Sequence, residues 1–416
     1  MADLAKEKQG VLGYLPEGAT AGEFDRLIDA RNSGDDRWFL KLCDGWLTNG
    51  YLLIVGETEI VPAFTIVRPT PGGDRVTIPL SDNPYADSCS HEDRPDLRVG
   101  RIIGNTAYEL AVPIRVSIDV SSGTLHQDHS DALVVVSHSN EVEYFIIWAA
   151  PLVSRLPSSY AMVTEVDWEY QDTEIDLLRE ALAILGTKWD LDDETDRPEP
   201  PAELSDLRDL VGRWDFDDDT DLPEPPDDLA QLRSLLSVSD AERVEAAKRG
   251  EPVRHYNLHP SSSEVLLARA HLVRDHAYDK DLICYVGHGG SGSWVWGLDE
   301  PHLDFIGFGS TAPVVFASAC ETGDYEAGWN PDEGIAEAFL QRGAGAYIGA
   351  TVVVNGGSAD EIQRQFCLNE WTPGRSVGEA LLSVKRNLMD IETPEGPSWT
   401  NHAYLWNLYG DPKFGG

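Results

Sequence analysis

The chain has 416 residues, enough to bury a large core, and its 42 % hydrophobic content with 12 tryptophans is that of a folded protein. Its charge is unusual, because 72 acidic residues against 32 basic ones give a formal net charge of −40. So acidic a chain repels nucleic-acid phosphates, which excludes DNA and RNA as expected partners. The charge suits a halophilic surface adapted to high salt, where screening removes the self-repulsion, and it would also attract basic substrates.

Cysteine usage and the N-terminus favour a cytoplasmic location. Five cysteines without regular spacing do not make a disulfide framework, and a reducing compartment fits them better. The start, MADLAKEKQG, has no apolar segment of the kind that a secretory signal needs. No window of the sequence approaches 18 apolar residues, so we expect neither secretion nor contact with a membrane.

The first 130 residues have the pattern of an α/β unit. Helical periodicity and short apolar runs alternate there, separated by segments rich in turn-forming residues. The predicted elements in chain order are a helix at 23–32, a buried strand at 49–56, a turn with a short extension at 57–64, a loop at 82–96 and a strand at 97–103.

A second unit, residues 131–416, opens with an apolar strand at 131–139 and is interrupted by an acidic insertion at about 180–250. Within the insertion, the segment that starts at Lys188 is repeated 25 residues later from Arg213. Each copy has a Trp-Asp start, an acidic run, a proline-rich bend and a short amphipathic helix. Two copies are too few for a solenoid, and neither acidic run matches an EF-hand loop. We interpret 188–238 as an appendage that shields the protein or binds a regulatory partner.

From residue 260 onward, helices and strands alternate regularly. This order predicts a mostly parallel sheet flanked by helices, in which chemistry gathers at the carboxyl ends of the strands. The predicted elements are a helix at 262–275, strands at 281–287 and 312–319, a helix at 333–343, a strand at 345–354 and a helix at 374–390.

The segment YVGHGGSGSW (285–294) contains the G-x-G-x-x-G spacing of a dinucleotide-binding loop. That interpretation requires a helix to begin at the loop, so that its N-terminus faces the pyrophosphate. The following residues, SWVWGLDEPHLDFIGFGS, have Trp, Gly and Pro where this helix should run, and the acidic ribose partner is missing at the expected distance. The context therefore argues against a dinucleotide site.

A Cys–His pair explains the same segment better. His288 follows the strand at 281–287, and Cys320 follows the strand at 312–319, so two neighbouring parallel strands would bring an imidazole and a thiol to one sheet edge. An imidazolium favours the thiolate and can later protonate a leaving amine. Glycine after the histidine lets a substrate backbone approach, so the N–H groups of Gly289 and Cys320 are candidate donors to an oxyanion. These residues predict a cysteine peptidase.

Other cysteines and histidines have simpler explanations. Cys43, Cys284 and Cys367 fit packing positions, because cysteine is among the most buried residue types. His138 also ends a strand and is the rival imidazole. The remaining pairs lack a third metal ligand nearby: Cys89 with His91, His255 with His259, and His271 with His276.

The sequence resembles the gingipain-type cysteine peptidases, which are relatives of the caspases. The resemblance is strongest in LICYVGHGGSGSW, PVVFASACETGDY and EGIAEAFLQRGAGAYIGAT, and it extends to GYLLIVGETEIVPAF, NPYAD, PDLRVGRI and LWNLYGDPKF. It implies a caspase-like α/β fold with two subdomains side by side, at 1–130 and 131–416. It also implies Cys320 as nucleophile, His288 as general acid, and Gly289 with Cys320 as oxyanion donors.

The resemblance has further implications and some departures. Gingipains prefer Arg or Lys before the cut, and the acidic composition makes a basic P1 residue plausible here too. No cofactor is required, although calcium, which some such enzymes bind, could use Asp82, Asp87, Asp93 or Asp96. Gingipains are secreted with propeptides, whereas this chain shows no signal peptide. The alternative is a non-proteolytic protein of the same fold that holds a partner with its acidic repeat.

Overall fold

The computed structural model describes residues 1–10, 50–69 apart from 59 and 62, 75–86, 95, 97–136, 160–163, 273–299 apart from 275 and 295–297, 303, 306–326, 334–389 apart from 355, and 399–416. Several expectations fall outside these residues. They are the helix at 23–32, most of the helix at 262–275, the acidic insertion, and Cys43, Asp87, Cys89, His91, Asp93, Asp96, His138, His255, His259 and His271.

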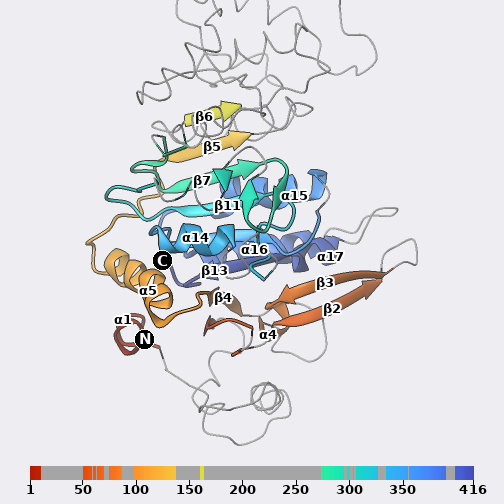
Figure 1. Ribbon diagram of the computed structural model, residues 1–416, viewed down its shortest axis with the longest axis horizontal. Helices are drawn as coiled ribbons and strands as arrows, with labels where there is room; N and C mark the ends of the chain where they lie inside the picture. The colour runs from red at the N-terminus through yellow and green to blue at the C-terminus, as the bar shows by residue number, and fades with distance from the viewer. Residues whose placement is uncertain are drawn as a thin grey trace, which may run out of the picture.

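An eight-stranded sheet forms the centre of the described structure (Figure 1). Its strands, in spatial order, are β1 (Tyr51–Val55), β4 (Arg98–Ile102), β13 (Trp406–Gly410), β12 (Ala346–Ala350), β11 (Val314–Ser318), β7 (Leu282–Val286), β5 (Ala132–Val136) and β6 (Tyr160–Val163). The pairs β1–β4, β12–β11, β11–β7, β7–β5 and β5–β6 are parallel, and β13 runs antiparallel to β12. The prediction of a mostly parallel sheet is confirmed.

Two helical layers cover this sheet. Figure 1 shows α14 (Ile335–Gln341) on the near face, and α15 (Gly356–Gln365), α16 (Val377–Met389) and α17 (Trp399–Tyr404) on the far face. Successive residues of a strand point to opposite faces, so Leu282, Cys284 and Val286 of β7 join the core cluster of α16, while Ile283 and Tyr285 join that of α14. Strands buried on both faces explain the continuous apolar runs seen in the sequence.

Several smaller elements complete the fold. The segment 82–96 was expected to be a loop, but it begins with a one-turn helix. Pro84 fits in this helix because proline suits the first helical turn. The described elements that were not predicted are α1 (Ala2–Glu7), the hairpin of β2 (Phe64–Pro69) and β3 (Arg75–Ser81), α4 (Asn83–Ala86), α5 (Ala107–Ser121), β6, the short strands β8 (Gly289–Gly290), β9 (Ser293–Trp294) and β10 (Leu298–Asp299), the π-helical segment Phe366–Glu370, α17 and β13. Among the described helices, none is long and apolar enough to cross a bilayer.

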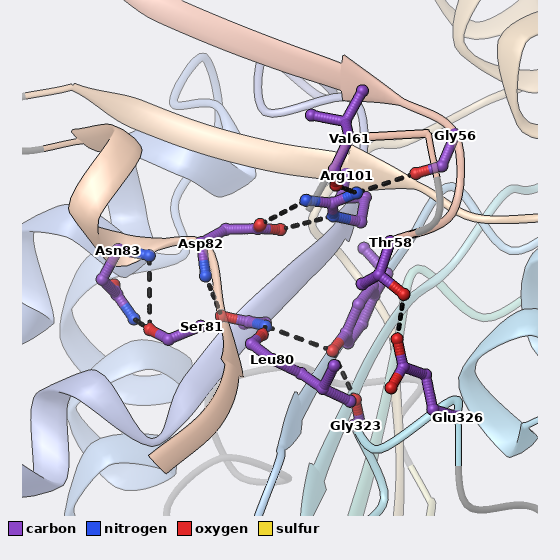
Figure 2. Close-up of polar contacts among 12 residues, drawn as sticks. Gly56, Thr58, Val61, Leu80, Ser81, Asp82, Asn83, Arg101, Gly323 and Glu326 are labelled. Atoms are coloured by element: carbon purple, nitrogen blue, oxygen red, sulfur yellow. Dashed lines mark hydrogen bonds and ion pairs between the residues drawn. The ribbon is translucent and has the colours of Figure 1, made fainter. Parts of the chain in front are cut away.

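A buried ion pair connects the first part of the chain to the sheet. Arg101 of β4 is 0 % exposed, and its Nε and Nη2 donate to the Asp82 carboxylate at 2.8 and 2.6 Å (Figure 2). Its Nη1 donates to the carbonyls of Gly56 and Val61, each at 2.8 Å. Burial alone would lower the pKa of Arg101, but the charge and hydrogen bonds of Asp82 raise it overall. The guanidinium therefore remains charged and ties the loop between β1 and β2 to the segment that follows β3.

A buried lysine extends this polar cluster. Lys385 of α16 donates to Asn83 Oδ1 at 2.6 Å and to the Trp406 carbonyl at 2.7 Å. Burial lowers the pKa of Lys385 to about 7, although the negative charge of Asp82 opposes the shift. Two acceptors suffice for the two N–H groups of a neutral amine, so the site accommodates the deprotonated form.

Replacing Asp82 with Asn should destabilise the protein by about 3 kcal/mol or more, because it leaves the Arg101 charge buried without its partner. Urea denaturation of the two proteins measures this difference. The half-exposed pair Glu361–Arg364, with a nitrogen–oxygen distance of 2.7 Å, provides the control. Glu361→Gln should cost about 0.5 kcal/mol or less, and equal losses from both variants would contradict a special role for the buried pair.

Lys385 should make stability rise with pH. Between the folded pKa of about 7 and the ordinary value of 10.5, the unfolded chain binds a proton that the native state does not. The free energy of unfolding of the wild type relative to Lys385→Met should therefore increase across this window, by up to about 1.4 kcal/mol per pH unit, and stay constant below it. The same comparison with Lys6→Met, at an exposed lysine, should be flat. A flat difference for Lys385 itself would show that its amine keeps an ordinary pKa.

Candidate functional site

The register of β7 and β11 brings the two predicted catalytic segments to one edge of the sheet. The ladder pairs Leu282 with Val314 and ends with Val286 opposite Ser318. The Gly287 N–H extends it by donating to the Ser318 carbonyl at 3.2 Å. His288 and Cys320 each stand two residues beyond the last pair, on strands about 4.8 Å apart. They thus occupy equivalent positions at the carboxyl ends of neighbouring strands.

Gly289 is in close contact with the turn that begins at Cys320. A Cβ atom built on Gly289 would lie 2.6 Å from Thr322 Cγ2 and 2.8 Å from both Ala319 Cβ and the Cys320 carbonyl oxygen. These distances leave no room for a side chain. The backbone that follows His288 therefore packs directly on the backbone that carries the thiol.

The backbone around His288 is fixed by an aromatic stack beneath it. The His288 side chain is exposed, and its carbonyl accepts a hydrogen bond from the Tyr285 hydroxyl at 2.7 Å. The Tyr285 ring stacks on Trp294 with a centroid separation of 4.4 Å and an interplanar angle of 1°. Trp294 belongs to β9, which pairs with β8 at Gly289. The glycine-rich segment is thus an ordered hairpin over buried rings.

Cys320 combines solvent access with a fixed sulfur position. It is partly exposed, whereas Cys284 and Cys367, the other described cysteines, are buried as predicted. The Val354 N–H lies 3.4 Å from the Cys320 sulfur. Val354 follows β12, so three adjacent strands deliver His288, Cys320 and Val354 to this edge.

The turn after Cys320 has an unusual backbone. Glu321 has a φ of 55°, in the left-handed region that non-glycine residues rarely adopt, and such strain often marks functional sites. The Glu321 N–H donates to the Val352 carbonyl at 3.1 Å, and the Gly323 N–H donates to the Ala350 carbonyl at 2.8 Å. The buried Tyr409 hydroxyl donates to the Gly323 carbonyl. Hydrogen bonds from two strands therefore hold the turn in place.

An acidic cavity of about 460 Å³ lies between this turn and the β2–β3 hairpin. Asp324 and Glu326, four and six residues after Cys320, line it from one side. Figure 2 shows the Thr58 hydroxyl, from the loop after β1, donating to the Glu326 carboxylate. The cavity lining also includes Ala63, Thr65, Pro79 and Leu80.

Asp82 does not present a free carboxylate to a calcium ion. Both of its oxygens accept hydrogen bonds from Arg101, so a cation already occupies the position that calcium would take. The other three calcium candidates, Asp87, Asp93 and Asp96, lie outside the described residues. Within the described part of the chain, no group of three or more His, Cys, Asp or Glu side chains could hold a metal ion. No catalytic step is assigned to calcium.

Sequence reasoning missed the groups that support the predicted pair. Val354 could have been found, because the strand at 345–354 was predicted and its carboxyl end must share an edge with that of 312–319. Tyr409 and the acidic cavity could not have been found from the sequence, because their contacts join segments more than 80 residues apart.

Comparisons with known proteins agree with this geometry. Residues 241–415 match the model of peptidase family C25, and no curated protein matches the chain. Among solved structures, the complex of the RgpB pro- and mature domains from Porphyromonas gingivalis matches with a TM-score of 0.55 at 14 % identity, over 99 % of this chain and 75 % of that one. The Arg-specific cysteine proteinase gingipain R (RgpB) has a TM-score of 0.53 at 14 % identity, over 99 % and 74 %.

A further structure, described as a protease, has a TM-score of 0.54 at 10 % identity and covers 99 % of this chain and 74 % of its own. At these identities the structural matches show a shared fold, the caspase-like fold of the gingipains. The family match covers the segment that contains β7, β11 and the turn after Cys320. Residues 241–415 are thus similar to the gingipain-type cysteine peptidases of family C25, and the described part of the chain shares the gingipain fold.

Proposed function

We propose that the protein hydrolyses peptide bonds through a Cys320–His288 dyad and an acyl-enzyme intermediate. The observation that carries the proposal is the contact of Gly289 with the Cys320 turn, because it joins the backbones of the two predicted catalytic residues. The shared register of β7 and β11 supports it independently. No cofactor takes part in this chemistry.

In the proposed reaction, the Cys320 thiolate attacks the carbonyl carbon of the scissile bond. His288, as an imidazolium, then donates its proton to the leaving amine. Water, deprotonated by the neutral imidazole, hydrolyses the resulting thioester and returns the thiol. The exposed position of His288 and the partly exposed position of Cys320 leave both groups within reach of a substrate chain.

Backbone N–H groups would stabilise the negative charge that develops on the carbonyl oxygen. Those of Gly289 and Cys320 are the proposed donors, since the two backbones are in contact. The Tyr285 hydrogen bond to the His288 carbonyl and the Tyr409 hydrogen bond to the Gly323 carbonyl hold the two flanking segments. Donors held in position before the reaction need no reorganisation when the charge forms.

A basic residue before the cut is the proposed preference, in protein or peptide substrates. The net charge of −40 attracts cationic chains, and Asp324 and Glu326 line a cavity close in sequence to Cys320. The structural relative gingipain R is described as Arg-specific. The acidic composition and irregular cysteines support a cytoplasmic setting with high salt.

A regulatory partner is proposed for the acidic repeat at 188–238. One of the structural relatives is a complex of a mature protease domain with its pro-domain. A protein or segment with a basic surface would complement the charge of the repeat and could restrain proteolysis inside a cell.

Replacing Cys320 with Ala should lower kcat/KM by at least about a thousandfold, because the nucleophile is lost, and His288→Ala should do nearly the same. A panel of peptides that differ at P1 (Arg, Lys, Ala and Glu), assayed in low and in molar salt, measures both activity and preference. Cys43→Ser is the matched cysteine control and should retain activity. Full cleavage by Cys320→Ala, with an unchanged melting temperature, would refute the dyad.

Gly289→Ala should reduce kcat by at least about a hundredfold, because its Cβ would push against the Ala319–Thr322 turn and displace both proposed oxyanion donors. Gly290→Ala is a close control, since a Cβ there has no atom within 4 Å. It should leave kcat nearly unchanged. Similar losses from both variants would indicate that the hairpin as a whole, rather than the contact at Gly289, governs the rate.

A further inference from the structure

Two buried cysteines from distant parts of the chain are in contact on the face of the sheet that packs against α16. The sulfur atoms of Cys284 and Cys367 lie 3.2 Å apart, although the residues are 83 positions apart in sequence. Each residue carries a thiol that is not part of a disulfide, and both are 0 % exposed within the core cluster that packs α16 on the sheet. Neither has a part in the proposed peptidase reaction.

The two residues occupy elements of different kinds. Cys284 is the central residue of β7, four residues before His288. Cys367 lies in the π-helical segment Phe366–Glu370, which ends with the Trp371 N–H donating to the Phe366 carbonyl at 2.8 Å. A π-helical turn holds one residue more than an α-helical turn needs, and such segments are frequent at functional sites.

We propose that Cys284 and Cys367 form a reversible internal disulfide when the protein is exposed to a peroxide. One thiol attacks the peroxide, whose oxygen–oxygen bond breaks, and this gives a sulfenic acid and one molecule of water or alcohol. The second thiol attacks the sulfenic sulfur, forms the sulfur–sulfur bond and releases water. Two thiols lose two electrons in total, and the peroxide accepts them. The sulfur atoms must approach by only about 1.2 Å to reach bonding distance.

The disulfide would link β7, the strand that leads to His288, covalently to the π-helical segment Phe366–Glu370. That segment continues α15, which begins two residues after Val354, whose N–H contacts the Cys320 sulfur. A cross-link between positions so far apart restricts the unfolded chain more than the folded one, so it should raise stability. Because the thiols lie next to each other in the native core, the fold can accept the bond with little rearrangement.

The test uses the full chain with Cys320→Ala, which removes the accessible thiol from competition. Hydrogen peroxide is added to the folded protein at room temperature and just below its melting temperature. The protein is then denatured, free thiols are alkylated, and peptides are mapped by mass spectrometry without reduction. The expected product is one cross-linked peptide pair containing Cys284 and Cys367, two hydrogen atoms lighter than the separate peptides, with a melting temperature raised by about 5 °C and restored by dithiothreitol.

Cys284→Ala and Cys367→Ser, each made with Cys320→Ala, should lose the peroxide-induced shift in melting temperature. Peptide mapping of the parent does not depend on how well these variants fold. Oxidation in urea, where all remaining cysteines can react, shows which disulfides form when the protein is unfolded. The proposal is overturned if the two cysteines stay alkylatable at both temperatures, if they are oxidised only to sulfinic or sulfonic acids, or if other pairs dominate in the folded protein.

Discussion

The parallel ladder between β7 and β11 is the constraint on which the site depends. Each strand is a run of five buried residues, and their hydrogen bonds fix Val286 opposite Ser318. A shift of one residue would turn each apolar side chain to the other helical layer, so the two cores together enforce the register. The positions of His288 and Cys320 follow from this register. The chemistry at the edge is therefore set by packing several residues away, in the middle of the sheet.

Two of the 32 basic residues, Arg101 and Lys385, have buried side chains. Arg101 and Lys385 lie in the interior, in contact with Asp82, Asn83 and backbone carbonyls. Removing positive charge from the surface makes that surface still more acidic than the composition alone suggests. The interior cluster also joins β4, α4, α16 and β13, which are far apart in sequence. Its charges thus organise the region where the first and last parts of the chain meet.

Much of the sheet could be predicted from sequence, because doubly buried strands have a simple signature. The runs LICYV and VVFAS are short and mostly apolar, and their shared edge follows from parallel pairing. The β2–β3 hairpin lacked this signal, since it stands outside the central sheet and is only partly buried. The π-helical segment and the Cys284–Cys367 contact depend on how α15 packs on the sheet, which no local pattern encodes. Likewise, the pairing of Asp82 with Arg101 joins a loop to a strand through tertiary packing, whereas the family resemblance had made that carboxylate one of four calcium candidates.

The left-handed backbone at Glu321 has a consequence for how this protein could be altered. A glycine would adopt that conformation without steric cost, yet the chain has a residue with a side chain there. The Cβ atom limits the conformations available to the turn, so the loop beside the thiol has fewer alternative shapes than a glycine would allow. A residue other than glycine at position 321 thus makes the turn near the sulfur more rigid, but it also makes the left-handed conformation harder to form. Efforts to make the protein more robust would do best to leave this turn alone and work on the helices of the far face.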